Sequence, residues 1–324
     1  MAGKERVIVW RITQSCDSKC KFCSYSREVE RQRDDADAAL IRSFSEVLGE
    51  YKKQTGDEVL VSWIGGEPFL RADLLEHSER LHDLGIKVSA TTNGIPLTEE
   101  KLRRIDACFC EIVFSLDSFR ECNDDVRGIF GLFDMVCKRI RELDRIRRES
   151  GSGIKIKVNT ILMRRNIADF ERFCEMLLGL GVDEVTFNRL GGYDRPEFFG
   201  DNRLLFEQSK AFSEQLPALK RRFAEKGLVI HGSAKYMERF MYAALDKPMA
   251  VEECNPGAWF WFVNENGFVS PCSYTSYEYK FPLSEVRCAA DFDRAEQFFR
   301  EQRRCARSKW CSDCFCTQVY DKFE

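Results

Sequence analysis

The sequence has no long apolar run, almost no net charge and few histidines, and each absence narrows what the protein can be. No stretch approaches the roughly 18 uncharged apolar residues of a membrane span, and the N-terminus lacks the apolar region of a secretory signal. The formal net charge of -3, from 50 basic and 53 acidic residues, gives no global reason to expect nucleic acid or an anionic membrane as a partner. We therefore expect a cytoplasmic protein that binds neither, with His231, one of only three histidines, in a structural role.

Cysteine, by contrast, is abundant, with 15 residues in a chain of 324. A disulfide framework is not expected without an export signal, because the cytosol keeps thiols reduced. The cysteines are unevenly placed, with three in 16–23, five scattered over 108–174 and seven crowded into 254–316. The two terminal groups indicate metal clusters, whereas the scattered five are expected to be small buried hydrophobic residues.

The first cysteine group has the spacing C-x3-C-x2-C and consists of Cys16, Cys20 and Cys23. Three thiolates cannot complete the four-ligand site of zinc, but they can hold three corners of a [4Fe–4S] cube and leave one iron open. A chance grouping, or a zinc site with its fourth ligand elsewhere, is the alternative. The aromatic residue Phe22 precedes the last cysteine.

Strand and helix patterns alternate through the first 190 residues. Apolar, β-branched stretches predict strands at 5–12, 58–69, 87–94, 110–117, 154–162 and 184–190. Apolar residues at helical spacing predict helices at 38–55, 73–84, 98–106, 130–149 and 167–179. Six such alternations predict an α/β fold, a partial (β/α)6 TIM-like barrel that is open on one side.

Small polar residues stand at the carboxyl ends of these strands, where α/β barrels place their chemistry. The second strand breaks at a Gly-Gly-Glu-Pro turn, whose glycines let backbone carbonyls approach a ligand closely. Taken alone, this turn is ordinary. The candidate residues at the strand ends are Gly65, Gly66, Glu67, Pro68, Thr92, Asn93, Ser115, Asp117 and Asn159.

The rest of the chain differs from the barrel. Residues 193–250 have helical patterns and form a predicted connector between a barrel at 1–192 and a small C-terminal domain at 251–324. In that domain, Asn266-Gly267 predicts the turn of a β-hairpin that brings Cys254 and Cys272, at its outer ends, near one another. A helix-containing tail follows, with further cysteines at Cys305, Cys311, Cys314 and Cys316.

The motif C-x3-C-x-Φ-C, followed by Gly-Gly-Glu-Pro, resembles the signature of the radical S-adenosylmethionine (radical SAM) superfamily. This resemblance implies a [4Fe–4S] cluster on Cys16, Cys20 and Cys23 whose open iron chelates the methionine part of SAM. Electron transfer then cleaves SAM to a 5′-deoxyadenosyl radical that abstracts hydrogen from the substrate. It also implies SAM contacts for Phe22, the Gly-Gly-Glu-Pro turn and the polar strand ends, and a contact to SAM or substrate for Arg127.

The hairpin spacing C-x12-G-x4-C with a later C-x2-C resembles the twitch domain, the short form of the SPASM domain. The resemblance implies one auxiliary [4Fe–4S] cluster held by Cys254, Cys272, Cys311 and Cys314. Cys305 and Cys316 are then spare or substitute ligands. Two incompletely ligated clusters, or a zinc ribbon with the same cysteines, are the alternatives.

A fully ligated auxiliary cluster has no open iron for substrate and is suited to accept an electron. We therefore expect an oxidoreductase that acts on a hydroxylated small molecule (a sugar, aminocyclitol or nucleoside) and is reduced by a flavodoxin- or ferredoxin-type donor. Only 15 residues precede Cys16, which leaves little room for a leader-binding domain and favours a small substrate. The alternatives are a peptide or protein maturase (thioether, carbon–carbon or formylglycine products), redox-neutral loss of carbon dioxide or water, and a non-enzymatic iron–sulfur or zinc redox sensor.

Overall fold

One curved sheet organises the protein. The computed structural model describes residues 5–23, 34–191 and 195–323. Within them the strand order is β10-β9-β8-β1-β2-β3-β4-β5-β6-β7. The parallel strands of the barrel are β1 (Glu5–Thr13), β2 (Glu58–Gly65), β3 (Lys87–Thr92), β4 (Glu111–Ser115), β5 (Lys155–Leu162), β6 (Glu184–Arg189) and β7 (Val229–Ile230).

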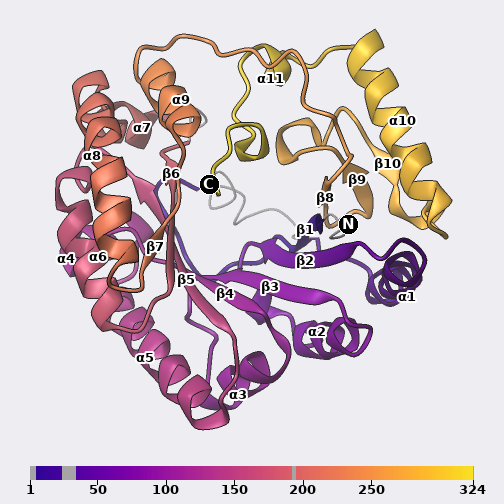
Figure 1. Ribbon diagram of the computed structural model, residues 1–324, viewed down its shortest axis with the longest axis horizontal. Helices are drawn as coiled ribbons and strands as arrows, with labels where there is room; N and C mark the ends of the chain where they lie inside the picture. Colours follow the sequence, from indigo (N-terminus) through magenta and orange to yellow (C-terminus); the bar gives the residue numbers. More distant parts are fainter. Residues whose placement is uncertain (1–4, 24–33, 192–194, 324) are drawn as a thin grey trace.

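Helices cover the convex side of this sheet (Figure 1). They are α1 (Ala38–Thr55), α2 (Leu74–Asp83), α3 (Glu99–Cys108), α5 (Leu132–Ser150), α6 (Phe170–Gly179) and α8 (Phe206–Ala224). Local chemistry sets their ends: the Asp37 side chain caps α1 by accepting a hydrogen bond from the Ala39 N–H at 2.6 Å, and Gly56 ends the helix in a left-handed conformation. The alternation of strands and covering helices is the predicted partial barrel.

The two faces of the sheet differ in polarity because side chains alternate along each strand. Outward-facing residues are mostly apolar, and Trp10 of β1 packs against Phe44 of α1 with ring centroids 5.8 Å apart. On the concave face a row of charges crosses the strands, with Lys157 between Glu111 (2.5 Å) and Glu184 (2.9 Å). The apolar side forms the core, and the polar side is left to line the barrel interior.

The C-terminal hairpin continues the same sheet. β8 (Phe260–Val263) pairs in parallel with β1, and β9 (Phe268–Ser270) and β10 (Phe281–Pro282) follow in antiparallel order. The predicted turn lies between β8 and β9. A buried ion pair joins Arg11 of β1 to Glu265 in that turn at 2.5 Å. The hairpin is thereby fixed to the strand that leads into the first cysteine group.

Two short helices and a longer one frame the remaining chain: α7 (Pro196–Asn202), α9 (Ala234–Ala244) and α10 (Ala290–Cys305), followed by the single turn α11 (Lys309–Ser312). The predicted boundary between residues 192 and 193 lies outside the described residues. One helix was not expected, α4 (Arg120–Arg127), because six of its eight residues are charged or polar and show no apolar periodicity. Its existence places Arg127 at a helix C-terminus, just ahead of the predicted helix at 130–149.

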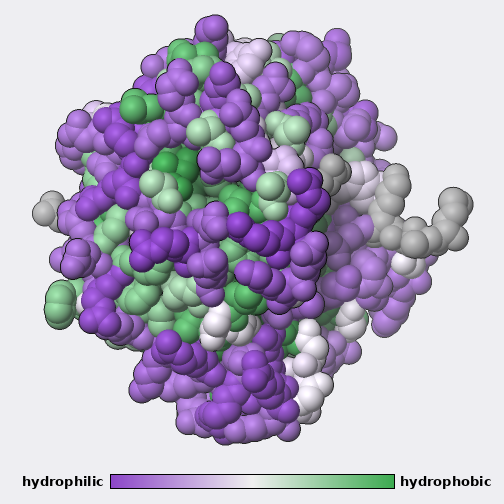
Figure 2. All heavy atoms as spheres, turned by 60° about the vertical axis from the view of Figure 1, so that its left-hand side comes forward, coloured by the Kyte–Doolittle hydropathy of each residue, from purple (hydrophilic) through white to green (hydrophobic). Residues whose placement is uncertain are grey.

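The outer surface is mostly polar. Figure 2 shows a face on which hydrophilic residues dominate and hydrophobic residues gather in smaller patches between them. In the part of the chain that the structure describes, every helix is too short or too polar to cross a bilayer.

Candidate functional site

The first cysteine group lines a cavity of about 300 Å³ at the carboxyl ends of the parallel strands. Cys16, Cys20 and Cys23 lie on the loop that leaves β1, and the Lys21 N–H holds this loop to the Val126 carbonyl at 2.8 Å. Beside the cysteines the cavity is lined by Ser18, Phe22, Ile64, Gly65, Gly66, Glu67, Thr91, Thr92, Asn93, Ser115, Arg127, Asn159 and Ile161. Residues from four strand ends and one helix end therefore meet the three thiols.

Burial controls the protonation of these thiols. It raises the pKa of Cys16 to about 11 and that of Cys20 to about 12, although the nearby Arg127 guanidinium opposes the shift at Cys20. Without metal both groups are thiols at neutral pH. Iron must therefore displace protons when a cluster assembles, and its binding is favoured by rising pH.

The Gly-Gly-Glu-Pro turn crosses directly under the cysteine loop. The Gly66 N–H donates to the Thr13 carbonyl at 2.8 Å, and the Glu67 N–H donates to the Ser15 carbonyl at 2.7 Å. A Cβ atom added to Gly66 would collide with the Ser15 carbonyl. The glycine is required because two backbones approach each other at this point.

Glu67 is buried under the cavity floor and already has protein partners. Its carboxylate accepts hydrogen bonds from the Asn93 N–H (2.6 Å), the Thr92 hydroxyl (2.8 Å) and the Phe69 N–H (3.1 Å). Burial raises the pKa of Glu67 to about 7, against the effect of these donors. The residue predicted to contact a ligand therefore also holds the end of β3 in place.

Two predicted contact residues do not line the cavity. Pro68 begins a short 3-10 helix, and the Asp117 side chain is fully buried. Asp117 forms an ion pair with Arg127 at 2.9 Å and accepts a hydrogen bond from the Ile161 N–H at 2.8 Å. The structure thus places Asp117 behind Arg127, where its carboxylate orients the Arg127 guanidinium at the cavity wall.

Asn159 has a fixed orientation in the cavity wall. Its side-chain oxygen accepts hydrogen bonds from the Thr186 hydroxyl at 3.0 Å and the Asn188 amide at 3.1 Å. Because the oxygen is engaged by the neighbouring strand, the Asn159 amide N–H groups are left for an acceptor in the cavity.

Sequence reasoning missed four residues of the cavity wall: Ser18, Ile64, Thr91 and Ile161. Three of them lie at the ends of strands on the side that faces the barrel interior. These three residues could have been found from the sequence, because side chains alternate along a strand and every second residue points into the barrel.

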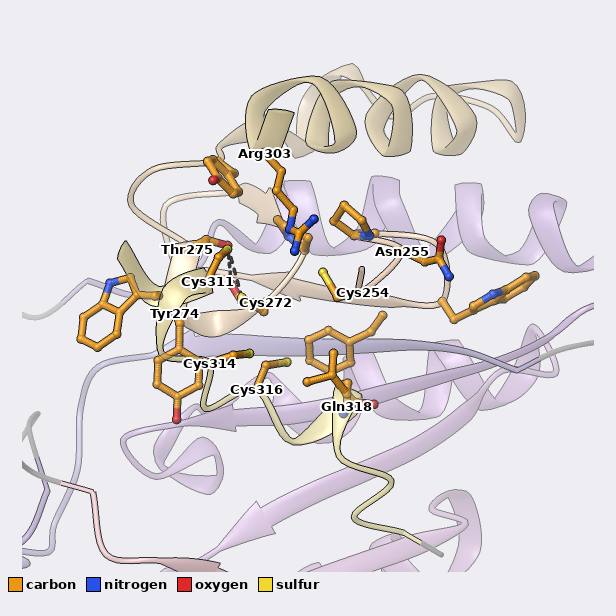
Figure 3. Close-up of a pocket in the computed structure, with 18 of the residues that line it drawn as sticks. Cys254, Asn255, Cys272, Tyr274, Thr275, Arg303, Cys311, Cys314, Cys316 and Gln318 are labelled. Atoms are coloured by element: carbon orange, nitrogen blue, oxygen red, sulfur yellow. Dashed lines mark hydrogen bonds between the residues drawn. The ribbon is translucent and has the colours of Figure 1, made fainter. Parts of the chain in front are cut away.

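A second cavity, of about 310 Å³, lies beside the hairpin. Figure 3 shows cysteines from three separate segments around it. Cys254 precedes β8, Cys272 follows β9, and Cys311, Cys314 and Cys316 come from the segment after α10. Cys305 does not line this cavity; it is exposed at the end of α10 and lies 3.0 Å from a Glu301 carboxylate oxygen.

The chemistry of the second cavity suits a soft metal cluster. Five thiols exceed the four that a fully ligated [4Fe–4S] cube requires. The buried Cys316 thiol donates to the Cys272 sulfur, which lowers the pKa of Cys272 to about 6 and raises that of Cys316. Among the described residues, no three His, Cys, Asp or Glu side chains converge on the position of a single metal ion.

Comparison with known proteins gives a family and a fold. The sequence model of the Radical SAM superfamily matches residues 10–177. The chain is 26% identical over 228 residues to Fe-coproporphyrin III synthase of Methanosarcina barkeri, with 69% of this chain and 54% of that protein covered. It is 30% identical over 179 residues to mycofactocin maturase MftC of Mycobacterium tuberculosis, with 54% and 42% covered. The chain thus spans about half the length of these two relatives.

A solved structure shares the architecture of the whole chain. SuiB of Streptococcus suis bound to S-adenosylmethionine superposes with a TM-score of 0.69 at 16% identity, over 98% of this chain and 72% of that one. This likeness confirms the predicted barrel.

Proposed function

The chain belongs to the radical SAM superfamily, and from this premise we propose an oxidoreductase that acts on a hydroxylated small molecule such as a sugar, aminocyclitol or nucleoside. A [4Fe–4S] cluster and SAM are the cofactors of the first cavity. When bound, they supply a 5′-deoxyadenosyl radical that removes a hydrogen atom from the substrate. Membership of the family argues against a non-enzymatic redox sensor.

Different residues of the first cavity would bind the cluster and the separate parts of SAM. Cys16, Cys20 and Cys23 would hold the cluster, and the buried Glu67 carboxylate offers charge to the cationic amino group of SAM. The Arg127 guanidinium and the Asn159 amide offer donors to a carboxylate and to ribose hydroxyls. Gly65 and Gly66 leave room for backbone carbonyls at the same wall.

The second cavity, with its five cysteines, is the observation that supports an oxidative reaction. An alcohol carbon that has lost its hydrogen atom becomes a ketone when it gives up one further electron and the hydroxyl proton. Four cysteines would leave no iron open for substrate, so a cluster there is suited to accept that electron. Cys254, Cys272, Cys311 and Cys314 are the proposed ligands, with Cys316 as the substitute that the cavity also contains.

The proposal also covers the domain division, the cellular location and the electron donor. The chain divides into a barrel at 1–192, a connector at 193–250 and a cluster domain at 251–324. The protein acts in the cytoplasm. A flavodoxin- or ferredoxin-type protein reduces the first cluster.

A peptide maturase is the second candidate, favoured by the 30% identity to mycofactocin maturase MftC. Redox-neutral loss of carbon dioxide or water needs no electron acceptor, so the first cavity alone would suffice for that reaction.

The deciding experiment offers deuterated candidates to protein reconstituted without oxygen and follows deuterium into 5′-deoxyadenosine. Transfer from a hydroxylated small molecule, together with a ketone product, supports the proposal. Transfer only from a peptide would favour the maturase, and failure to cleave SAM would refute both.

A further inference from the structure

The C-terminal tail runs from α11 into the space enclosed by the curved sheet (Figure 1). Gln318 and Val319 line the second cavity. Tyr320 is then fixed by a hydrogen bond from its hydroxyl to the Cys314 carbonyl at 3.0 Å, and the Ser233 hydroxyl donates to the Tyr320 carbonyl at 2.9 Å. Two residues later, Lys322 lies inside the barrel.

Lys322 is a buried cation whose two contacts among the described residues are both neutral: the Asn188 side chain and the Phe323 ring, whose centroid lies 5.3 Å from the ammonium. The residue is 6% exposed, and its ammonium donates to the Asn188 side-chain oxygen at 3.0 Å. Among the described residues no carboxylate contacts it. Burial alone lowers the pKa of Lys322 to about 7. A buried ammonium without a counter-charge is costly, because the desolvation of the charged form is not offset.

The other titratable groups around the tail are already engaged. His231 lies 2.8 Å from Glu184 and also contacts the Phe323 carbonyl at 3.1 Å. Lys235 pairs with Asp321 at 3.2 Å at the surface. The Tyr236 hydroxyl donates to Asn188 and to the Phe187 carbonyl, both at 3.0 Å. Lys322, in contrast, contacts a neutral amide and an aromatic ring and has no carboxylate partner among the described residues.

Hydrogen bonds connect Lys322 to the first cavity. Asn188 accepts from Lys322 and donates to Asn159, which lines that cavity. On the other side, three residues of chain separate Lys322 from Gln318 in the wall of the second cavity. The ammonium thus lies behind the wall of the first cavity, two hydrogen bonds from Asn159, on a tail whose earlier residues line the second cavity.

We propose that Lys322 binds a carboxylate of the substrate, which makes the substrate a hydroxylated acid. The inference rests on the proposed function and narrows its substrate class. One ammonium balances the single charge of a carboxylate, and the Asn188 amide keeps the ammonium oriented when the ligand is absent. A merely structural lysine that ties the tail to β6 is the competing role.

The test measures binding of glycerate by calorimetry to reconstituted, SAM-bound protein, with glycerol as the neutral probe of the same carbon chain. We expect glycerate to bind and glycerol not to bind. Lys322→Met should weaken glycerate binding about tenfold or more, as expected for the loss of a charged hydrogen bond. Lys322→Arg should restore binding, and Lys235→Met, which removes only the surface ion pair of the tail, should leave it unchanged.

Proton uptake separates the two roles of Lys322. At pH 8 most Lys322 side chains are neutral, so glycerate binding should take up close to one proton, measured by repeating the titration in buffers of different ionisation enthalpy. The uptake should disappear at pH 6, and in Lys322→Arg at both pH values, because the cation is then already charged. A tail-tying lysine would produce no such linkage.

Several results would overturn the inference: no glycerate binding to the parent protein, equal binding by Lys322→Met, equal binding of glycerol, or no proton uptake at pH 8. SAM binding and reductive SAM cleavage should be the same in the parent and in Lys322→Met. Loss of SAM cleavage in the parent protein would refute the proposed function itself. Intact cleavage with Lys322-independent binding would refute only this inference.

Discussion

At the scale of the residue, Glu67 shows how one side chain serves both the fold and the ligand. Three hydrogen bonds tie its carboxylate to the end of β3, yet it lines the cavity and its pKa is raised to about 7. A cationic ligand group would favour the charged form and draw the pKa back down. The Glu67 carboxylate is thus suited to bind a cationic ligand group, because the hydrogen bonds that it accepts from the protein all come from neutral donors.

Glu67→Gln should weaken SAM binding about ten- to a hundredfold, because a charge-assisted hydrogen bond worth roughly 1.5 to 3 kcal/mol is lost. Equilibrium binding of SAM to reconstituted protein measures this effect. Glu76→Gln, an exposed acid in the first turn of α2, is the matched control and should bind SAM normally. Normal binding by Glu67→Gln would limit Glu67 to its role in the turn.

The cysteines give a second prediction at this scale. Reconstituted parent protein should hold about eight irons per chain, four in each cavity. Replacing Cys16, Cys20 and Cys23 with Ala should leave about four and abolish SAM cleavage, because the ligands of the first cluster are gone. Cys288→Ser and Cys305→Ser, both at exposed thiols, should retain about eight irons. Stoichiometric zinc in the parent protein would contradict the auxiliary cluster.

At the scale of the element, a row of charges joins β4, β5, β6 and the residue after β7. Lys157 contacts Glu111 and Glu184, and Glu184 in turn contacts His231. The hydrogen bond from His231 and the contact with Lys157 lower the pKa of Glu184 to about 2. His231 also contacts the Phe323 carbonyl, so this row links the first residues of β4 and β6 to the C-terminal tail.

A lowered carboxyl pKa stabilises the fold above the pKa of the unfolded chain, and this contribution is lost as the pH falls towards 2. Glu184→Gln should therefore lower the free energy of unfolding by about 1 kcal/mol at pH 7, a figure discounted for the partial exposure of the group. Thermal unfolding should show a lower Tm at pH 7, and the difference should shrink as the pH falls below about 4.

Glu46→Gln, at an exposed ion pair with Arg80, is the control and should have a Tm close to that of the parent. A Tm difference for Glu184→Gln that stays constant down to pH 3 would show that the charge of Glu184 is not what stabilises the sheet.

At the scale of the whole molecule, the two cavities are joined by one continuous sheet. β8 of the hairpin pairs with β1, and β1 leads directly to the first cysteine group. The buried pair between Arg11 and Glu265 fixes the same junction. This arrangement places the proposed site of hydrogen abstraction and the proposed electron acceptor on one continuous sheet.

The electronic role of the second cavity is tested by removing Cys311 and Cys314 together. Deuterium should still pass from substrate to 5′-deoxyadenosine, but the oxidised product should disappear, because the substrate radical has lost its electron acceptor. The measurement is valid on variant protein that stays monodisperse and keeps about four irons, since loss of the cluster also removes stability. Oxidised product at the parent rate would make the domain a lid or a docking surface instead.

The sequence by itself determined the parts of this protein that depend on neighbouring residues. Three cysteines within eight positions stay close together in any fold, and alternating apolar patterns predict the strands and helices of the barrel. The family and the barrel predicted on these grounds are both confirmed. The hairpin was predictable for the same reason, because Asn266-Gly267 dictates its turn locally.

Only the tertiary structure decided which distant residues meet. Cys305 and Cys316 were equivalent in the sequence, but Cys305 ends exposed on α10 while Cys316 lines the second cavity. Asp117 follows its strand as a ligand-binding residue would, yet packing buries it against Arg127. Lys322 carries no local signal, because its burial depends on a contact with Asn188, 134 positions away in the chain. Such contacts arise from the packing of whole elements, which no short pattern of residues encodes.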